Sequence, residues 1–213
     1  MKIIILTVLI MPQIIFAQSK IEGLGLLKLH TTLKTAKEML YAQYSVSNYG
    51  GDDNNLGGDS NVVELHGDYS DDSSNLHVYV YLSFFKDTLY EIHVFEDNVG
   101  NADLYQAFKM KHGKGKASGR NYIILCRCLC CATPTKYPSY DSTYIWKQGK
   151  IYSKMELSHK TVYANGGCNL VIDKSLDIKD MEIEKRRSVY LTKKENERKE
   201  EEKAATLKLM NKL

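Results

Sequence analysis

The sequence predicts an α+β fold in which helices pack on an antiparallel sheet, and three patterns predict it. Apolar residues recur at every second position from Leu76 to Phe84, which is the period of a strand that buries one face. A second β-rich run, Leu89 to Phe95, follows a short polar interval. Helical patterns that begin near Thr32 and Asp103 each precede a group of predicted strands, and such segregation is typical of the α+β class.

The two central strands are predicted to form a hairpin whose loop of about three residues is centred on Asp87. The expected pairs are Phe84 with Tyr90, Leu82 with Ile92, and Val80 with Val94. A slip of one residue would place Glu91 opposite Leu82 on the buried face, so this register is favoured. On the other face, Tyr81 is expected opposite His93.

Two helices are expected to cover the sheet. A short lead-in strand over 21–29 precedes the first, for which Thr32 is the expected cap. Its apolar side consists of Leu33, Ala36, Leu40 and Tyr44. The second helix is expected to begin after Asn101 or Asp103 and to end at Gly113, because helices often close on a residue in the left-handed region.

The remaining strands are shorter, and turn-rich segments separate them. Strands are expected over 62–66, 121–131, 143–146, 151–157 and 168–173, and loops over 49–61, 67–75, 114–120 and 133–142. From about Leu176 the chain is charged and helix-forming. The order suggests a degenerate tandem repeat of a helix followed by strands, with an α+β domain over 18–173, its halves over 18–100 and 101–173, and a charged helical segment over 174–213.

One part of the chain resembles a known kind of domain. The run from Gly25 to Leu40 resembles the strand, turn and helix that open BamE-like and β-lactamase-inhibitor-protein-like periplasmic domains, with His30 and Thr31 where those domains usually carry Gly and Met. The Leu-Tyr-x-Ile strand at 89–92 and the helix that ends Lys111-His112-Gly113-Lys114 are similar to such domains too. The resemblance implies a small envelope protein that works through protein contacts without a catalytic centre.

The N-terminus predicts secretion. Lys2 is followed by fourteen apolar or uncharged residues, Ile3 to Phe16, and then by Ala17, which is the pattern of a signal peptide over 1–17 that is cleaved after Ala17. This run is short against the roughly 20 residues that span a bilayer, so we expect a periplasmic or secreted protein without an integral membrane segment after cleavage. The formal net charge of +3 is too small to predict nucleic-acid binding.

An acidic loop is a candidate calcium site. Asp53, Asn55, Asp59 and Glu64 follow the spacing of oxygen ligands in an EF-hand loop, with Gly58 at the turn position. Position five of the loop is Gly57, which has no side-chain oxygen, and the segment after the loop is expected to be a strand where an EF-hand has a helix. A solvated acidic loop is the alternative, because Asp, Asn and Gly are common in any loop.

The five cysteines leave three interpretations open. Cys126, Cys128 and Cys130 alternate along a predicted strand, with Cys131 adjacent and Cys168 distant. They can be small buried residues, one of them can pair with Cys168 in an oxidising compartment, or the cluster can bind zinc. The spacing differs from the C-x₂-C pairs of common zinc sites.

The sequence therefore predicts a non-enzymatic interaction module of the bacterial cell envelope that binds a protein partner through a sheet face or edge. One alternative is a calcium-dependent binding or structural protein that uses the 53–64 loop. Another is a hydrolase with a dispersed active site, because catalytic triads assemble from distant positions. No catalytic residue is assigned, since the sequence has no G-x-S-x-G, H-E-x-x-H or P-loop motif.

Overall fold

The computed structural model describes residues 19–43, 54–55, 61–71, 76–96, 104–126, 135–164 and 167–210 of the 213-residue chain. The helices are α1 (Leu33–Gln43), α2 (Leu104–His112) and α3 (Met181–Met210). The strands are β1 (Gly23–Leu24), β2 (Leu27–Lys28), β3 (Asn54–Asn55), β4 (Val62–Asp71), β5 (Leu76–Phe85), β6 (Thr88–Glu96), β7 (Lys116–Cys126), β8 (Thr135–Gln148), β9 (Ile151–Ala164) and β10 (Gly167–Asp180).

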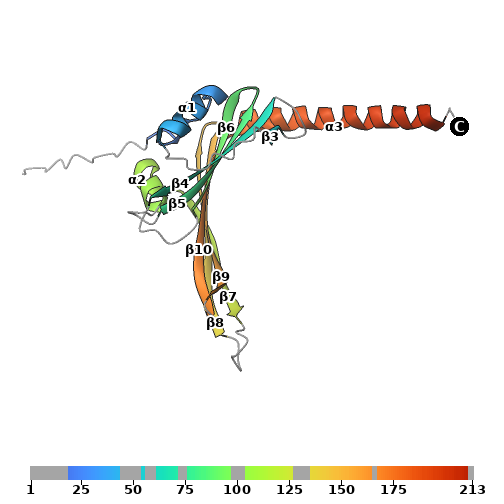
Figure 1. The fold of residues 1–213 in the computed structure, drawn as a ribbon. Helices are drawn as coiled ribbons and strands as arrows, with labels where there is room; N and C mark the ends of the chain where they lie inside the picture. The colour runs from blue at the N-terminus through green and yellow to red at the C-terminus, as the bar shows by residue number, and fades with distance from the viewer. Residues whose placement is uncertain are drawn as a thin grey trace, which may run out of the picture.

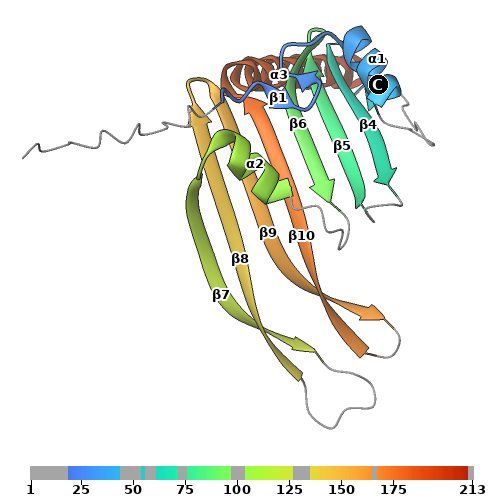
Figure 2. The ribbon, with the colours of Figure 1, turned by 90° about the vertical axis from the view of Figure 1, so that its left-hand side faces the viewer.

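Eight strands form an antiparallel sheet in the order β3-β4-β5-β6-β10-β9-β8-β7, and β1 pairs with β2 in a small separate sheet. The predicted α+β class is confirmed. The two groups of strands meet where β10 pairs with β6, from Lys174 opposite Glu96 to Lys179 opposite Glu91. In Figures 1 and 2 the long strands β7 to β10 run past the part of the sheet near the helices and form an arm. We call residues 120–126, 135–141, 158–164 and 167–173 of these strands the distal arm.

The two faces of the sheet are covered by different helices. On the inner face, α1 and α2 pack on one core that contains Ala36 and Leu40 of α1, Phe108 of α2, and the fully buried Leu82 and Ile178 of the sheet. On the outer face, the start of α3 packs on a second, smaller core (Figure 1). The part of the sheet near the helices is therefore the middle layer between two helical layers.

The two short helices were predicted correctly, as were the start of the first and the end of the second. The Thr32 hydroxyl accepts a hydrogen bond from the Thr35 amide at 3.3 Å, as a cap does, and α1 begins at the next residue, Leu33. Gly113 follows α2 with a φ of 77°, and its amide donates to the Lys109 carbonyl at 2.8 Å. Tyr44, Asn101 and Asp103 lie outside the described residues. The lead-in segment forms the β1–β2 hairpin instead of the single strand that was expected.

In the central hairpin, Val80 lies opposite Val94 and Leu82 opposite Ile92, as predicted. Phe84, however, lies opposite Leu89, so the predicted pair with Tyr90 and the three-residue loop were wrong. The turn consists of Lys86 and Asp87, whose φ values of 49° and 60° are those of a two-residue turn that suits the twist of the strands. A β-bulge then shifts the register and moves Tyr90 into the second core.

Several strands extend beyond their predicted bounds, and β9 continues from the expected 151–157 to Ala164. β4 continues through residues 67–71, and β7 and β8 include most of 114–120 and 133–142, which were expected to be loops. Pro138 favoured a loop, yet it lies in β8 opposite Ile123 of β7. The pairing of β8 with β9 covers Ser142–Gln148 and excludes Pro138, so the missing amide breaks no bond in that ladder.

The last strand corrects the expected start of the terminal helix. β10 continues to Asp180, so residues 174–180 belong to the sheet and α3 begins at Met181, where the sequence predicted a helix from about Leu176. Leu176 and Ile178 are fully buried on the inner face. The charges of Asp177 and Lys179, which favoured a solvated helix, alternate with them and lie on the outer face, where each has an oppositely charged or histidine partner.

The carboxylate of Asp180 joins β10 to α3 and is fully buried. Its Oδ1 accepts hydrogen bonds from the amides of Glu182 and Ile183, at 2.9 and 3.2 Å, and so caps the helix. Its Oδ2 accepts a hydrogen bond from His30 Nε2 at 2.7 Å and lies 3.1 Å from Lys150 Nζ. Burial raises the pKa of Asp180, but these donors outweigh burial, and the pKa lies below its ordinary value.

His30 connects this carboxylate to the central hairpin. Its φ is 70°, in the left-handed region, and its amide donates to the Leu89 carbonyl at 2.7 Å. The side chain then reaches Asp180, which is 150 residues away in the sequence. The lead-in segment, the central hairpin, the last strand and α3 are thus held together around one side chain.

We expect Asp180→Ala to lower the free energy of unfolding by about 2–4 kcal/mol, because it removes both a helix cap and the carboxylate that binds His30 and Lys150. Urea unfolding followed by circular dichroism measures this. The control is Glu182→Ala, whose side chain is 71% exposed, with an expected effect within about 0.5 kcal/mol. Equal unfolding midpoints for the two variants would contradict the role of Asp180.

Candidate binding face of the sheet

The structure describes two of the four candidate calcium ligands. Asn55 belongs to β3 and pairs with Val63, while Glu64 lies in β4 opposite Asn54, with its Oε2 at 3.9 Å from His66 Nε2. Asp53 and Asp59 lie outside the described residues. β4 runs on from Glu64 to Asp71, so the strand expected after the loop is present. Within the described residues, no three acidic, His or Cys side chains are grouped to hold a metal ion, and calcium binding stays a prediction.

The cysteines stay equally open. β7 ends at Cys126, and the second residue of β10 is Cys168. Cys128, Cys130 and Cys131, which were predicted to continue the strand, lie outside the described residues. The interpretations as buried residues, as a bridge to Cys168 and as a zinc cluster are therefore still predictions.

The outer face of the sheet carries a continuous line of polar and aromatic side chains, which we call the histidine row. It consists of His66, Tyr81, His93, Asp177 and Lys154, one from each of the adjacent strands β4, β5, β6, β10 and β9. The Tyr81 ring lies 4.7 Å from that of His66 and 5.7 Å from that of His93, between centroids. His93 Nδ1 lies 2.5 Å from Asp177 Oδ1. The predicted position of Tyr81 opposite His93 is confirmed.

Rows on both sides of the histidine row are also polar. On the side toward α3, Lys179 Nζ lies 2.7 Å from Glu91 Oε1, and both side chains are largely buried. On the side toward the distal arm, Phe95, Ser175 and Glu156 line a hollow of about 340 Å³. The outer face therefore offers charges of both signs, hydrogen-bonding groups, aromatic rings and a recess, which are the features of a protein-binding surface.

The ion pair changes the acidity of His93. The hydrogen bond with Asp177 is the largest cause and raises the pKa of His93, partial burial lowers it, and the charge of Asp177 raises it further. The pKa of His93 lies above its ordinary value as a result. Glu91 and Lys179 act on the same ring with opposite signs. His93 is therefore charged over a wider pH range than a free histidine.

In the part of the chain that the structure describes, α3 contacts the outer face through its first turns. Ile183 is buried against Val62, Phe85 and Tyr90, and Tyr190 and Leu191 pack on the same cluster. The rings of Phe85 and Tyr190 lie 5.4 Å apart, and the Arg187 guanidinium lies 5.7 Å from the Tyr90 ring centroid. These contacts, together with the Asp180 cap, fix the direction in which α3 leaves the sheet.

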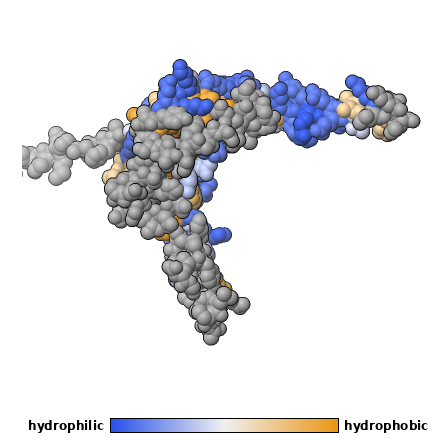
Figure 3. Space-filling model, in the orientation of Figure 1, coloured by the Kyte–Doolittle hydropathy of each residue, from blue (hydrophilic) through white to orange (hydrophobic). Residues whose placement is uncertain are grey.

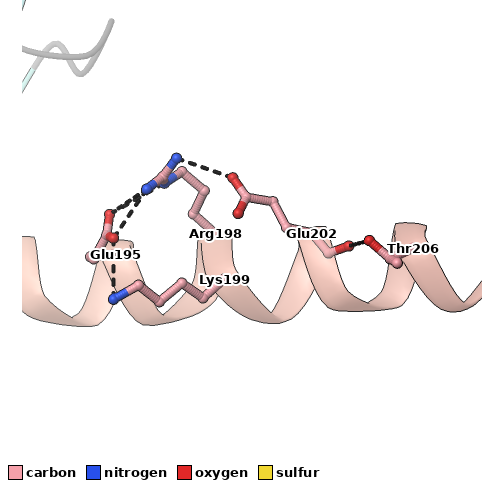
Figure 4. Close-up of polar contacts among 5 residues, drawn as sticks. All are labelled: Glu195, Arg198, Lys199, Glu202 and Thr206. Carbon is pink, nitrogen blue, oxygen red and sulfur yellow. Dashed lines mark hydrogen bonds and ion pairs between the residues drawn. The ribbon is translucent and has the colours of Figure 1, made fainter.

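The rest of α3 projects away from the sheet. Its 30 residues span about 45 Å, and every described side chain from Asn196 to Lys208 is exposed. Figure 3 shows this part of the helix as mainly hydrophilic. Arg198 bridges Glu195 and Glu202 at 3.0 Å each, and Lys199 lies 3.3 Å from Glu195, as Figure 4 shows. Such pairs stabilise an unsupported helix.

Two features of this region were missed in the sequence, for different reasons. The start of α3 had a recognisable signal, because Asp180 is a good cap and the acidic Glu182 and Glu184 occupy the first turn. The pair of His93 with Asp177 had none, because it depends on the pairing of β6 with β10 across 84 residues. Local periodicity carries no information about that pairing.

The histidine row also bears on the hydrolase alternative. His93 and Asp177 are arranged like the base and the orienting carboxylate of a catalytic triad, which are two of its three members. Acyl transfer needs, in addition, a nucleophile beside the second ring nitrogen and donors for the developing oxyanion. A hydrolase with a dispersed site therefore stays a prediction.

The raised pKa of His93 predicts how stability changes with pH. The protonated ring is stabilised in the folded state, so its contribution is complete below the ordinary pKa of about 6.5 and is lost as the pH rises through the raised pKa. The difference in free energy of unfolding between the protein and His93→Gln is expected to be largest below about pH 6.5 and to shrink above it. Urea titrations from acid to alkaline pH measure it, with Tyr81→Phe as a control that leaves the ion pair intact. A difference that grows with pH would rule out this role.

No protein-family model, curated protein or solved structure matches the chain significantly. The resemblance of the run from Gly25 to Leu40 to BamE-like and β-lactamase-inhibitor-protein-like domains therefore stays a prediction.

Proposed function

We propose that the chain is a secreted or periplasmic interaction module of the bacterial cell envelope, without catalytic activity, that binds a protein partner. The binding site consists of the outer face around the histidine row and the projecting part of α3. The signal-peptide pattern over 1–17 supports the location. The resemblance of the run from Gly25 to Leu40 to small envelope domains supports the same location.

The projection of α3 is the observation that carries the proposal. A helix whose second half packs on nothing in its own described chain gains no stability from burial there, and Arg198 and its neighbours support it by ion pairs instead. Its first turns are fixed firmly by Asp180 and Ile183, so the exposed half is held in one direction. A rigidly presented, unburied helix beside a polar face is suited to a partner that fills the angle between them.

The chemistry of these surfaces favours a protein partner over a nucleic acid. α3 carries nine Lys and Arg against seven Glu, and the signs alternate along its length. The outer face likewise pairs cations with anions, as in Lys179 with Glu91 and His93 with Asp177. A nucleic-acid site presents a field of one sign, whereas a protein interface uses mixed charges and aromatic rings. Within the described residues, no helix has the length and apolar character needed to cross a membrane.

Retention of an envelope protein on the immobilised mature chain tests the proposal. A version that ends at Lys194 removes the projecting half of α3 but keeps β10 and the packed turns, so its fold should persist. We expect it to lose at least about tenfold in apparent affinity for the retained protein, because it loses half of the site. Tyr81→Ser, in the middle of the histidine row, should weaken retention in the same direction.

Leu26→Ser is the matched control, because Leu26 is 52% exposed and lies in the lead-in hairpin that belongs to the inner side of the sheet. It should retain the partner as the unaltered chain does. Circular dichroism confirms that each variant is folded before retention is compared. If both the shortened chain and Tyr81→Ser bind the same protein as well as the unaltered chain, the proposed site is wrong.

A further inference from the structure

The strand β7 forms one edge of the large sheet, and no described strand pairs with its free edge. It is the last strand in the sheet order, and it spans eleven residues (Figure 2). Every side chain from Lys116 to Asn121 is exposed, and Ile123 and Leu125 are each 62% exposed. An edge strand leaves alternate amides and carbonyls without partners, so a long exposed edge strand with apolar side chains at one end can pair with a further strand.

The sequence of β7 suits antiparallel pairing with itself. If two copies meet with Asn121 opposite Asn121, the strands overlap over their full length. The opposed pairs are then Lys116 with Cys126, Ala117 with Leu125, Ser118 with Ile124, Gly119 with Ile123, and Arg120 with Tyr122. Each small residue of the inner face thus lies opposite a large apolar one. Each cation lies opposite an uncharged residue.

Other registers are less favourable. A pairing centred on Arg120 would place the two Arg120 side chains opposite each other, and directly opposed like charges destabilise a sheet. A pairing centred on Tyr122 would leave Lys116 and Ala117 without a strand partner. The two-fold axis perpendicular to the sheet requires that inner residues oppose inner residues, so any register centred between two residues, which would pair inner with outer side chains, is excluded.

Tyr140 completes the fit on the inner face. A Cβ added at Gly119 would overlap the Tyr140 hydroxyl, so the tyrosine side chain lies across this glycine from the neighbouring strand. The Tyr140 side chain is nevertheless 43% exposed. Ile123 of a second copy, placed opposite Gly119, would contact the exposed side of the Tyr140 ring. Pairing of the two strands would thus cover three exposed apolar side chains per copy, namely Ile123, Leu125 and Tyr140.

We propose that two copies of the chain form a symmetric dimer through antiparallel pairing of their β7 strands, centred on Asn121. The dimer continues the sheet across the two-fold axis and closes, since each copy uses the same edge. The interface lies on the distal arm and the strand that leads to it. It is separate from the histidine row and α3, so the inference does not depend on the function proposed above.

The test measures self-association by sedimentation equilibrium. The unaltered protein is expected to show a reversible monomer–dimer equilibrium, and Leu125→Glu should weaken it at least about tenfold, because a carboxylate then lies against Ala117 of the other copy. Leu125 lies opposite Lys136 within its own chain, so a glutamate there should not destabilise the monomer. Thermal unfolding of the variant verifies this.

Charge complementation tests the register itself. Adding Ala117→Lys to Leu125→Glu should restore the dimer, because the two sites are opposed between copies. Within one chain they are eight residues apart, about 27 Å along the strand, so they cannot pair there. The control adds Ser118→Lys instead, which places the same charge on the opposite face and should not restore association.

Three results would overturn the proposal. The first is a protein that stays monomeric up to about 100 μM, because the dissociation constant of the dimer would then exceed that expected for a specific interface. The second is a Leu125→Glu variant that associates as tightly as the unaltered chain. The third is equal restoration by Ala117→Lys and Ser118→Lys. The version that ends at Lys194 should keep the dimer, so a failure of partner binding and a failure of dimerisation can be told apart.

Discussion

The direction of α3 depends on the buried carboxylate of Asp180. One oxygen caps the helix through the amides of Glu182 and Ile183, and the other binds His30 and lies within reach of Lys150. A buried anion is tolerated only when donors surround it, so the four partners must stay in place together. The lead-in segment, the β8–β9 turn and the last strand are thereby tied to the first turn of the helix.

The separation of the two faces of the sheet is the second constraint. The inner face is apolar and closed by α1 and α2, while the buried apolar cluster of the outer face lies beneath the start of α3. The β-bulge at the central hairpin supports this arrangement, because it moves Tyr90 from the inner face to the patch that Ile183 covers. The remaining outer surface is left to polar and aromatic side chains, of which the histidine row is the centre.

Local patterns in the sequence predict the local structure well. The register at Val80 and Leu82 follows from periodicity, and the start of α1 and the end of α2 follow from the caps at Thr32 and Gly113. The prediction of a helix from about Leu176 was wrong because the charges of Asp177 and Lys179 lie on a sheet face, in β10. The candidate site could not be predicted from the sequence. The contacts of His93 with Asp177 and of His30 with Asp180 depend on the order of the strands in the sheet, which no single segment encodes.

The proposed binding site requires a helix that is anchored at one end and unsupported at the other. Hydrogen–deuterium exchange along α3 tests this directly, because amides that open only when the sheet opens share its protection. We expect the amides from about Ile183 to Leu191 to exchange slowly, at rates comparable with those of β6 and β10, and the amides from Asn196 to Met210 to exchange fast. Uniform exchange along the whole of α3, whether fast or slow, would contradict it.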